Sequence, residues 1–149
     1  MTDRIRYSAD YVWEVRNEAA RVYLIESGIP RVPHFIEDGP SGATDAGGGP
    51  RFLLLGYYRD LDGAYYLDRE SGAVWYLRPG GAFFVNSSPR QLVASFEAYL
   101  DITRGDLAGD DEAVEECLRS ALRAIDPAAI DDRHSVWNDT LGDVSMGVY

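Results

Sequence analysis

Residues 51–100 read RFLLLGYYRDLDGAYYLDRESGAVWYLRPGGAFFVNSSPRQLVASFEAYL, in which short apolar runs alternate with turn signals. The apolar and aromatic runs occupy positions 52–58, 64–67, 73–77 and 82–85. Each gap between them contains glycine, which supplies the positive φ that tight hairpin turns require. Strands this close in sequence pair most simply with their neighbours. The stretch therefore predicts an antiparallel meander, around which the rest of the chain adds helices and loops.

A helix is predicted from Pro89 to Leu100, at the end of this stretch. Ser88 is a good N-cap, Pro89 fits the first helical position, and Gln91 completes a capping box. The helix should lie on the sheet through one apolar stripe, made of Leu92, Val93, Phe96, Tyr99 and Leu100. Asn86 precedes the helix at a strand-to-helix turn, so we expect it to bond local backbone rather than to act in catalysis.

The N-terminal third predicts a helix over residues 8–27, capped by Ser8 or Asp10. Its apolar stripe, interpreted as a core face, is Tyr11, Val12, Val15, Ala19, Val22 and Tyr23. Residues 32–36 predict a short strand. Residues 38–50 are rich in glycine and predict a flexible surface loop.

Two C-terminal helices are predicted, over residues 110–125 and roughly 135–146. Acidic residues crowd the first turn of the former, where the helix dipole favours anions. Cys117 lies within its apolar stripe, so we expect an inert core thiol. Trp137 is the expected anchor that docks the last helix onto the domain.

The size and residue content of the chain favour one soluble globular domain spanning residues 1–149. A single cysteine cannot form an internal disulfide, which fits a reducing cytoplasm. The longest apolar run is too short to span a membrane, and the first eleven residues contain no apolar run typical of a signal peptide. We therefore expect a cytoplasmic protein without a membrane partner.

The charge of the chain excludes several kinds of chemistry. The formal net charge is −11, and all fourteen basic residues are arginine. Without lysine there can be no Walker phosphate loop, no Schiff base and no pyridoxal-phosphate anchor. Nucleic acid is a poor partner, since phosphate affinity comes largely from clustered cations. An acidic protein instead attracts a basic partner, although acidity alone also serves solubility.

No residue pattern identifies an active site. The two histidines lie one hundred positions apart, and with one cysteine they form no recognisable zinc pattern. Two carboxylate pairs, Asp60 with Asp62 and Asp68 with Glu70, fall at predicted hairpin turns, where aspartate is common for conformational reasons. We therefore assign no catalytic residue, no metal and no cofactor.

Two surfaces are candidates for binding a partner. The meander carries three adjacent aromatic pairs, Tyr57-Tyr58, Tyr65-Tyr66 and Trp75-Tyr76. Adjacent residues on a strand point to opposite faces, so one ring of each tyrosine pair should face outward and mark a binding face, unless it packs under loops or helices. The aromatic candidates are Tyr57, Tyr65 and Trp75.

The second candidate surface is acidic. Its residues are Asp110, Asp111, Glu112, Glu115 and Glu116. They are either ordinary solvated helix surface or a docking face for a cationic partner. We do not expect the aromatic and acidic candidates to lie on one surface.

Several motifs occur in the order found in a known family. They are 23–30 (YLIESGIP), 55–57 (LGY), 67–75 (LDRESGAVW), 84–88 (FVNSS) before a helix with Phe96 and Leu100, and Trp137 with Gly147. Over residues 20–148 the chain resembles the SUKH superfamily of bacterial immunity proteins, particularly its fourth family. It departs mildly at Ser71, where threonine is commoner, and at Pro89, where an aliphatic residue is expected.

The resemblance implies an α+β fold with a central, mainly antiparallel sheet flanked by N-terminal and C-terminal helices. It also implies a non-catalytic immunity protein that binds a cognate secreted or contact-delivered toxin, nuclease- or deaminase-like, and neutralises it by occlusion. A nuclease is often basic, so an acidic inhibitor suits it. The alternatives are a general protein-interaction module of the same fold, or a carboxylate-dependent hydrolase if the four turn carboxylates converge in one pocket.

Overall fold

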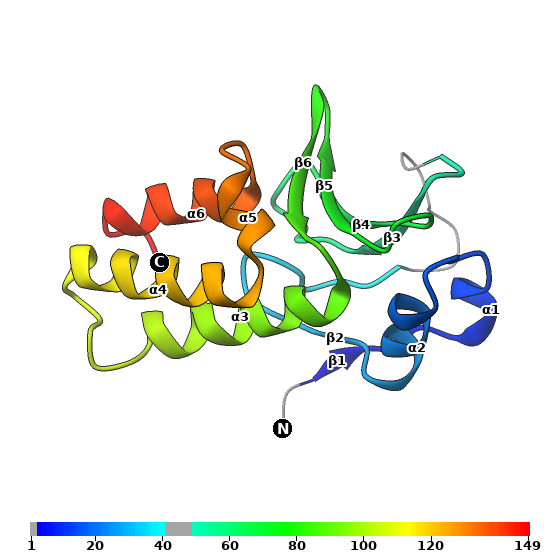
Figure 1. Ribbon diagram of the computed structural model, residues 1–149, viewed down its shortest axis with the longest axis horizontal. Helices are drawn as coiled ribbons and strands as arrows, with labels where there is room; N and C mark the ends of the chain where they lie inside the picture. Colours follow the sequence, from blue (N-terminus) through cyan, green and yellow to red (C-terminus); the bar gives the residue numbers. More distant parts are fainter. Residues whose placement is uncertain (1–2, 41–48) are drawn as a thin grey trace.

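The computed structural model describes residues 3–40 and 49–149 (Figure 1). These residues fold as a four-stranded antiparallel sheet, a two-stranded ribbon and six helices. The C-terminal helices stand on one side of the sheet in Figure 1, and the short N-terminal helices lie on the other. The expected α+β class, with helices from both ends of the chain flanking a central sheet, is confirmed.

The four strands of the main sheet pair in sequence order, which confirms the meander. They are β3 (Phe52–Gly56), β4 (Ala64–Asp68), β5 (Val74–Arg78) and β6 (Gly81–Asn86). Every neighbouring pair is antiparallel. Gly72 and Gly80 adopt φ angles of 80° and 98° at the β4–β5 and β5–β6 turns, a conformation that other residues rarely adopt, whereas Gly63 before β4 does not have a positive φ.

Four helices follow the sheet. They are α3 (Pro89–Thr103), α4 (Asp111–Ile125), α5 (Pro127–Asp131) and α6 (Val136–Ser145). The Ser88 cap is present, since its hydroxyl accepts from the Gln91 N–H at 3.2 Å and donates to Gln91 Oε1 at 2.9 Å. The predicted helices over 89–100, 110–125 and 135–146 are therefore confirmed.

The predicted helix over residues 8–27 is interrupted. It consists of α1 (Ala9–Val12) and α2 (Glu18–Glu26), with a break between them. The break occurs because backbone and side chain there bond to the hairpin between β4 and β5. The Arg16 N–H donates to the Arg69 carbonyl at 2.8 Å, and Asn17 Nδ2 donates to the Ser71 carbonyl at 3.1 Å. Asn17 then caps α2 through a bond from the Ala20 N–H.

The break also changes which residues face the core. Val12, Val15, Ala20 and Leu24 are buried, whereas Ala19 and Val22 of the predicted stripe are exposed. The buried residues of α1 and α2 do not follow one continuous helical periodicity, because the break between the two helices changes which side chains face the core. Before α1, strand β1 (Arg4–Ile5) pairs with β2 (Ile29–Pro30), which follows α2.

The strand predicted over residues 32–36 is a closed turn instead. The Val32 N–H donates to the Ile36 carbonyl at 2.8 Å, and the Ile36 N–H donates back to Val32 at 3.1 Å. His34 sits at the turn with a φ of 71°. The predicted loop over 38–50 is paired at its start, since Asp38 and Tyr57 exchange backbone bonds. Residues 41–48 lie outside the described residues.

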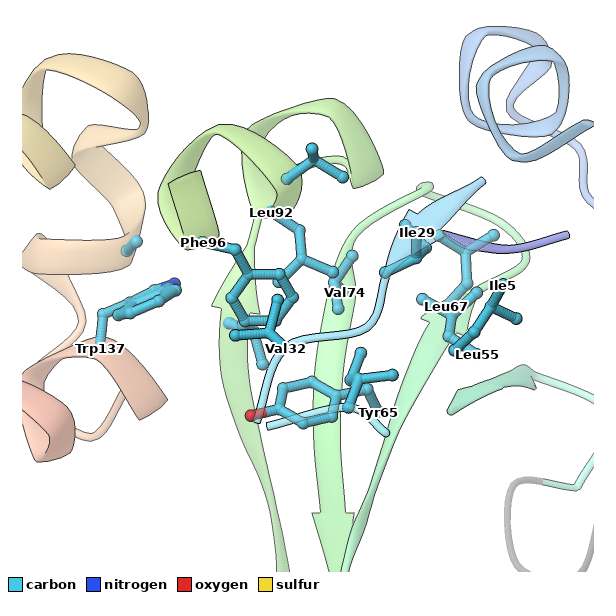
Figure 2. Packing of buried hydrophobic residues seen from close by; sticks show 14 of the residues in the cluster. Ile5, Ile29, Val32, Leu55, Tyr65, Leu67, Val74, Leu92, Phe96 and Trp137 are labelled. Atoms are coloured by element: carbon cyan, nitrogen blue, oxygen red, sulfur yellow. The ribbon is translucent and has the colours of Figure 1, made fainter. Parts of the chain in front are cut away.

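The core lies between one face of the sheet and the helices α3 and α6 (Figure 2). Leu55, Tyr65, Leu67 and Val74 come from the sheet, and Leu92, Phe96 and Trp137 come from the helices. Trp137 is fully buried, and its ring lies 5.6 Å from that of Phe35 and 5.9 Å from that of Phe96. Its expected role as an anchor is confirmed.

The expectation of a buried thiol at Cys117 is wrong, because this side chain is exposed. The fully buried row of α4 is Val114, Leu118 and Leu122, at strict i, i+4 spacing. The face of α4 that packs inward is thus narrower than its apolar stripe, which leaves Cys117 at the surface.

Candidate functional site

A cleft of about 540 Å³ opens between the sheet, helix α6 and the turn at His34. Its aromatic lining comes from six separate parts of the chain and consists of Phe35, Tyr65, Tyr76, Phe83, Tyr99 and Tyr149. Its titratable and charged lining consists of His34, Asp62, Arg78, His134, Asp139 and Asp143. The two histidines, a hundred positions apart in sequence, therefore line one cavity. Its volume is in the range of ligand-binding sites.

The walls of the cleft are aromatic rings in contact with one another. The rings of Tyr65 and Tyr76 meet edge to face with centroids 5.0 Å apart, and those of Phe35 and Tyr99 do so at 5.1 Å. The guanidinium of Arg78 lies 4.5 Å from the centroid of the Phe83 ring, a cation–π geometry. The wall is therefore largely aromatic, and one of its rings already contacts a cation.

Tyr65 forms part of the floor of this cleft. Its side chain is only 3% exposed, and burial strongly raises the pKa of its phenol. No residue that the structure describes forms a hydrogen bond with this hydroxyl, although it lines the cavity. Figure 2 shows the hydroxyl pointing away from Leu55 and Leu67. The oxygen of this hydroxyl is not fully closed off from solvent, so it is available to something that enters the cleft.

Carboxylates stand beside the phenols at the rim. Burial raises the pKa of Tyr76, and the nearby charge of Asp62 raises it further, while the Gly63 N–H that bonds its hydroxyl lowers it in part. Burial likewise raises the pKa of Tyr99, with the charges of Arg104 and Asp143 acting in opposite directions. Across residues 3–40 and 49–149, neither Asp62 nor Asp143 forms an ion pair.

The acidic residues of α4 differ in their local roles. Asp110 is the N-cap, since its side chain accepts from the Ala113 N–H at 3.2 Å. Glu115 is paired with Arg119. Glu112 and Glu116 are exposed and have no ion pair or side-chain hydrogen bond within the described part of the chain. Some acidic residues of this region therefore stabilise the helix, and others are exposed carboxylates that a partner could contact.

The acidic start of α4 adjoins the cleft through Tyr149. The Tyr149 hydroxyl donates to Asp111 Oδ1 at 2.9 Å and accepts from the Gly109 N–H at 2.9 Å. The same side chain lines the cleft together with Tyr65. One predicted aromatic and one predicted acidic residue therefore belong to adjoining surfaces, whereas we expected the two sets to be separate.

Net charge is concentrated in this part of the molecule. Residues 97–149 contain thirteen Asp or Glu and four Arg, a formal net charge of −9, whereas residues 1–96 contribute −2. The C-terminal helices supply most of these carboxylates. Negative charge is therefore denser in the C-terminal third of the chain, which includes α6 beside the cleft, than in the rest of the sequence.

The other aromatic candidates lie elsewhere. Trp75 pairs across the sheet with Tyr66 and stacks edge to face with Phe84 at 5.4 Å. Its buried Nε1 has no hydrogen-bond partner among the described residues. Tyr57 is half-buried where β3 meets Asp38. These two residues do not line the cleft, so they stay predictions for a different face.

Of the two alternatives for the second ring of a tyrosine pair, outward exposure or packing under other segments, Tyr65 and Tyr66 show the latter. Both are buried, since Tyr66 is only 6% exposed. The opposite face of the sheet is covered near β3 and β4 rather than open. Part of the N-terminal segment reaches β3, where the Tyr11 hydroxyl donates to the Leu54 carbonyl at 2.7 Å.

The four turn carboxylates do not converge. Asp62 lines the aromatic cleft, whereas Asp68 and Glu70 line a separate hollow beside Trp13. Asp60 accepts from the Tyr58 hydroxyl at 3.1 Å. Within the described ranges, no three His, Cys, Asp or Glu side chains form a group able to hold a metal ion. The geometry that a carboxylate-dependent hydrolase would need is therefore not found there.

Sequence reasoning missed the cleft because its residues carry no shared local motif. The signal nearest to it was the density of aromatic residues in the meander, which indicated a binding face but not where it lies. His34, Tyr99 and Tyr149 come together only through the packing of α3 and α6 beside the sheet.

Comparison with known proteins gives one family. None of the helices in the described residues is long and apolar enough to cross a membrane. No curated protein and no solved structure matches the chain significantly. The model of the SUKH-4 immunity protein family, however, matches residues 5–143. This span includes the hairpin of β4 and β5 and the junction of β6 with α3, where the resembling motifs lie. The chain therefore belongs to the SUKH-4 immunity protein family.

Proposed function

We propose that this immunity protein binds one cognate, basic toxin and neutralises it by covering its functional surface. Family membership is the observation that carries the proposal, because an immunity protein acts against a toxin. The toxin is nuclease- or deaminase-like and is met in the cytoplasm of the producing or a neighbouring cell. No step of chemistry by this chain is needed.

The charge distribution supports a basic partner. The last third of the chain carries a net −9, and Glu112 and Glu116 present free carboxylates there. A nuclease needs cations to hold its anionic substrate, and an acidic inhibitor complements that same surface. Such complementarity speeds the encounter more than it raises affinity.

A rescue experiment tests the function. The gene product encoded beside this chain is expressed at a toxic level, with and without the immunity protein, and the two purified proteins are mixed in a pull-down. We expect growth to be restored and a stable complex to form. Unchanged killing together with no complex would contradict the proposal.

Charge-matched variants test the basic partner. Glu112→Gln with Glu116→Gln removes two free carboxylates from α4, and Glu18→Gln with Glu26→Gln removes two exposed ones from α2. We expect the α4 pair to lower the association rate with the toxin by about fivefold at low salt and the α2 pair by less than about twofold. Added salt should remove the difference, since it screens exposed charges. Equal rates for both pairs would contradict docking at α4.

A further inference from the structure

We propose that the aromatic cleft is a socket for an arginine side chain of the toxin. This inference rests on the proposed function and deepens it, because it names the group that anchors the partner. Three independent features of the cleft favour a guanidinium: the unpartnered Tyr65 hydroxyl on its floor, the aromatic walls, and the unpaired carboxylates at its rim.

The Tyr65 hydroxyl on the floor of the cleft can accept a hydrogen bond from a ligand. Tyr65 is only 3% exposed, and no described residue bonds its hydroxyl, whose oxygen is still reachable from the cleft. Once a bound ligand excludes water from this oxygen, a donor on the ligand is favoured, since leaving the oxygen unpaired would then have a free-energy cost. A guanidinium carries five N–H donors in a fixed fork, so it can reach this oxygen and still bond a carboxylate.

The walls already hold a guanidinium at contact distance. Arg78 lies 4.5 Å from the centroid of Phe83, one of the lining rings. Tyr76 and Tyr99 add two further aromatic rings to the lining. A planar cation stacks on such faces better than an ammonium does, which favours arginine over lysine.

The rim supplies the opposite charge. Asp62, Asp139 and Asp143 line the cleft against one arginine, and none of them is in an ion pair within the described chain. An anionic ligand would meet these three carboxylates, and an apolar side chain would leave them and the Tyr65 hydroxyl without partners. The charge balance therefore selects a cation.

The test uses small probes on the ¹⁵N-labelled protein. N-acetyl-arginine methylamide is titrated while amide shifts are recorded, with N-acetyl-citrulline methylamide as the neutral isostere and N-acetyl-leucine methylamide as the apolar competitor. We expect saturable shifts at cleft residues with a dissociation constant in the millimolar range for arginine. Citrulline and leucine should bind at least fivefold more weakly. No saturation with arginine, or equal binding by citrulline or leucine, would overturn the inference.

Variants locate the site. Asp139→Asn with Asp143→Asn should weaken the arginine probe at least fivefold, and Tyr65→Phe should weaken it about threefold by removing one acceptor. Glu18→Gln with Glu26→Gln, the control of equal charge change, should leave it unchanged. An equal loss in the control would show a diffuse charge effect and overturn the socket.

The toxin separates this inference from the proposed function. If wild-type protein binds the toxin and the double variant at Asp139 and Asp143 binds it at least tenfold more weakly than the control, the socket is supported. If both variants bind it equally, the socket fails while the immunity function stands. If wild type neither binds nor neutralises the toxin, the proposed function fails, and with it the claim that a toxin arginine fills the cleft.

Discussion

Trp137 touches two polar sites that are built in opposite ways. On one side its Nε1 donates to Asn86 Oδ1 at 2.9 Å, in a buried network with Ser87, Ser95 and Asp126. On the other its ring packs against Phe35 and Tyr99, which line the cleft. The network is satisfied: Asp126 alone accepts from Asn86 Nδ2, the Ser87 N–H and the Ser87 hydroxyl. In the cleft, by contrast, the Tyr65 hydroxyl and the carboxylates of Asp62, Asp139 and Asp143 have no hydrogen-bond or ion-pair partner among the described residues.

The difference indicates which polar groups hold the fold and which are free to bind. A satisfied buried network fixes how β6 meets α3, α5 and α6, and a gap in it would cost the full desolvation of its members. Groups left unpaired in the cleft contribute nothing to folding in this state. They are therefore the groups through which a partner can gain affinity at little cost to stability.

The largest expected effect follows from breaking the network at Asp126. This side chain is 2% exposed, and Asp126→Ala would leave buried donors of Asn86 and Ser87 unpaired. We expect a loss of about 3 kcal/mol in the free energy of unfolding, measured by urea denaturation. Asp143→Ala at the cleft rim is the control and should change it by less than about 0.5 kcal/mol. Similar losses for the two variants would erase the contrast between the sites.

A smaller effect distinguishes Tyr7 from Tyr65, two buried residues whose hydroxyl groups differ in their partners. The Tyr7 hydroxyl donates to the Leu55 carbonyl at 2.6 Å, whereas the Tyr65 hydroxyl has no partner in the described chain. Tyr7→Phe should destabilise the protein by about 1–2 kcal/mol, because a buried carbonyl loses its donor. Tyr65→Phe should change stability by less than about 0.5 kcal/mol. If Tyr65→Phe proved as costly as Tyr7→Phe, its hydroxyl would have a structural role after all.

The smallest effect concerns pH and an ion pair outside both sites. Burial alone would raise the pKa of Asp68, but bonds from Arg51 and from the Glu70 and Ser71 N–H groups outweigh it, so the pKa lies below its ordinary value of 3.8. A lowered folded-state pKa contributes stability that is fully present above the unfolded value and is lost as pH falls through the folded one.

Thermal melts between about pH 2 and pH 6 check this expectation. The melting temperature of Asp68→Asn should fall less steeply below about pH 4 than that of wild type. Glu26→Gln, which removes an exposed carboxylate, should follow the wild-type profile. Parallel curves for wild type and Asp68→Asn would contradict a lowered pKa at this position.

The meander and the helix caps could be predicted because their signals are local. Glycine at the hairpin turns and Ser88 before Pro89 act through neighbouring backbone, so sequence spacing is sufficient. The break between α1 and α2 could not, because it depends on bonds from Arg16 and Asn17 to a hairpin more than fifty residues away.

The candidate site was predicted only in part, for the same reason. Tyr65 and Asp111 were selected by residue type, but the sequence contains no sign that Tyr149 connects their surroundings. Asn86 was expected to bond nearby backbone, and instead it bonds side chains from three helices. Contacts that join distant segments follow from packing, which periodicity and turn chemistry do not specify.

The most direct measurement is the footprint of the cognate toxin on the ¹⁵N-labelled protein, recorded as amide shifts and as protection from hydrogen exchange. The cleft and the acidic start of α4 are predicted to form the contact surface, so the changes should concentrate at Tyr76, Tyr99, Asp111 and Asp143 and their neighbours. Changes centred instead on Trp75 and Tyr57, with the cleft unaffected, would contradict the account.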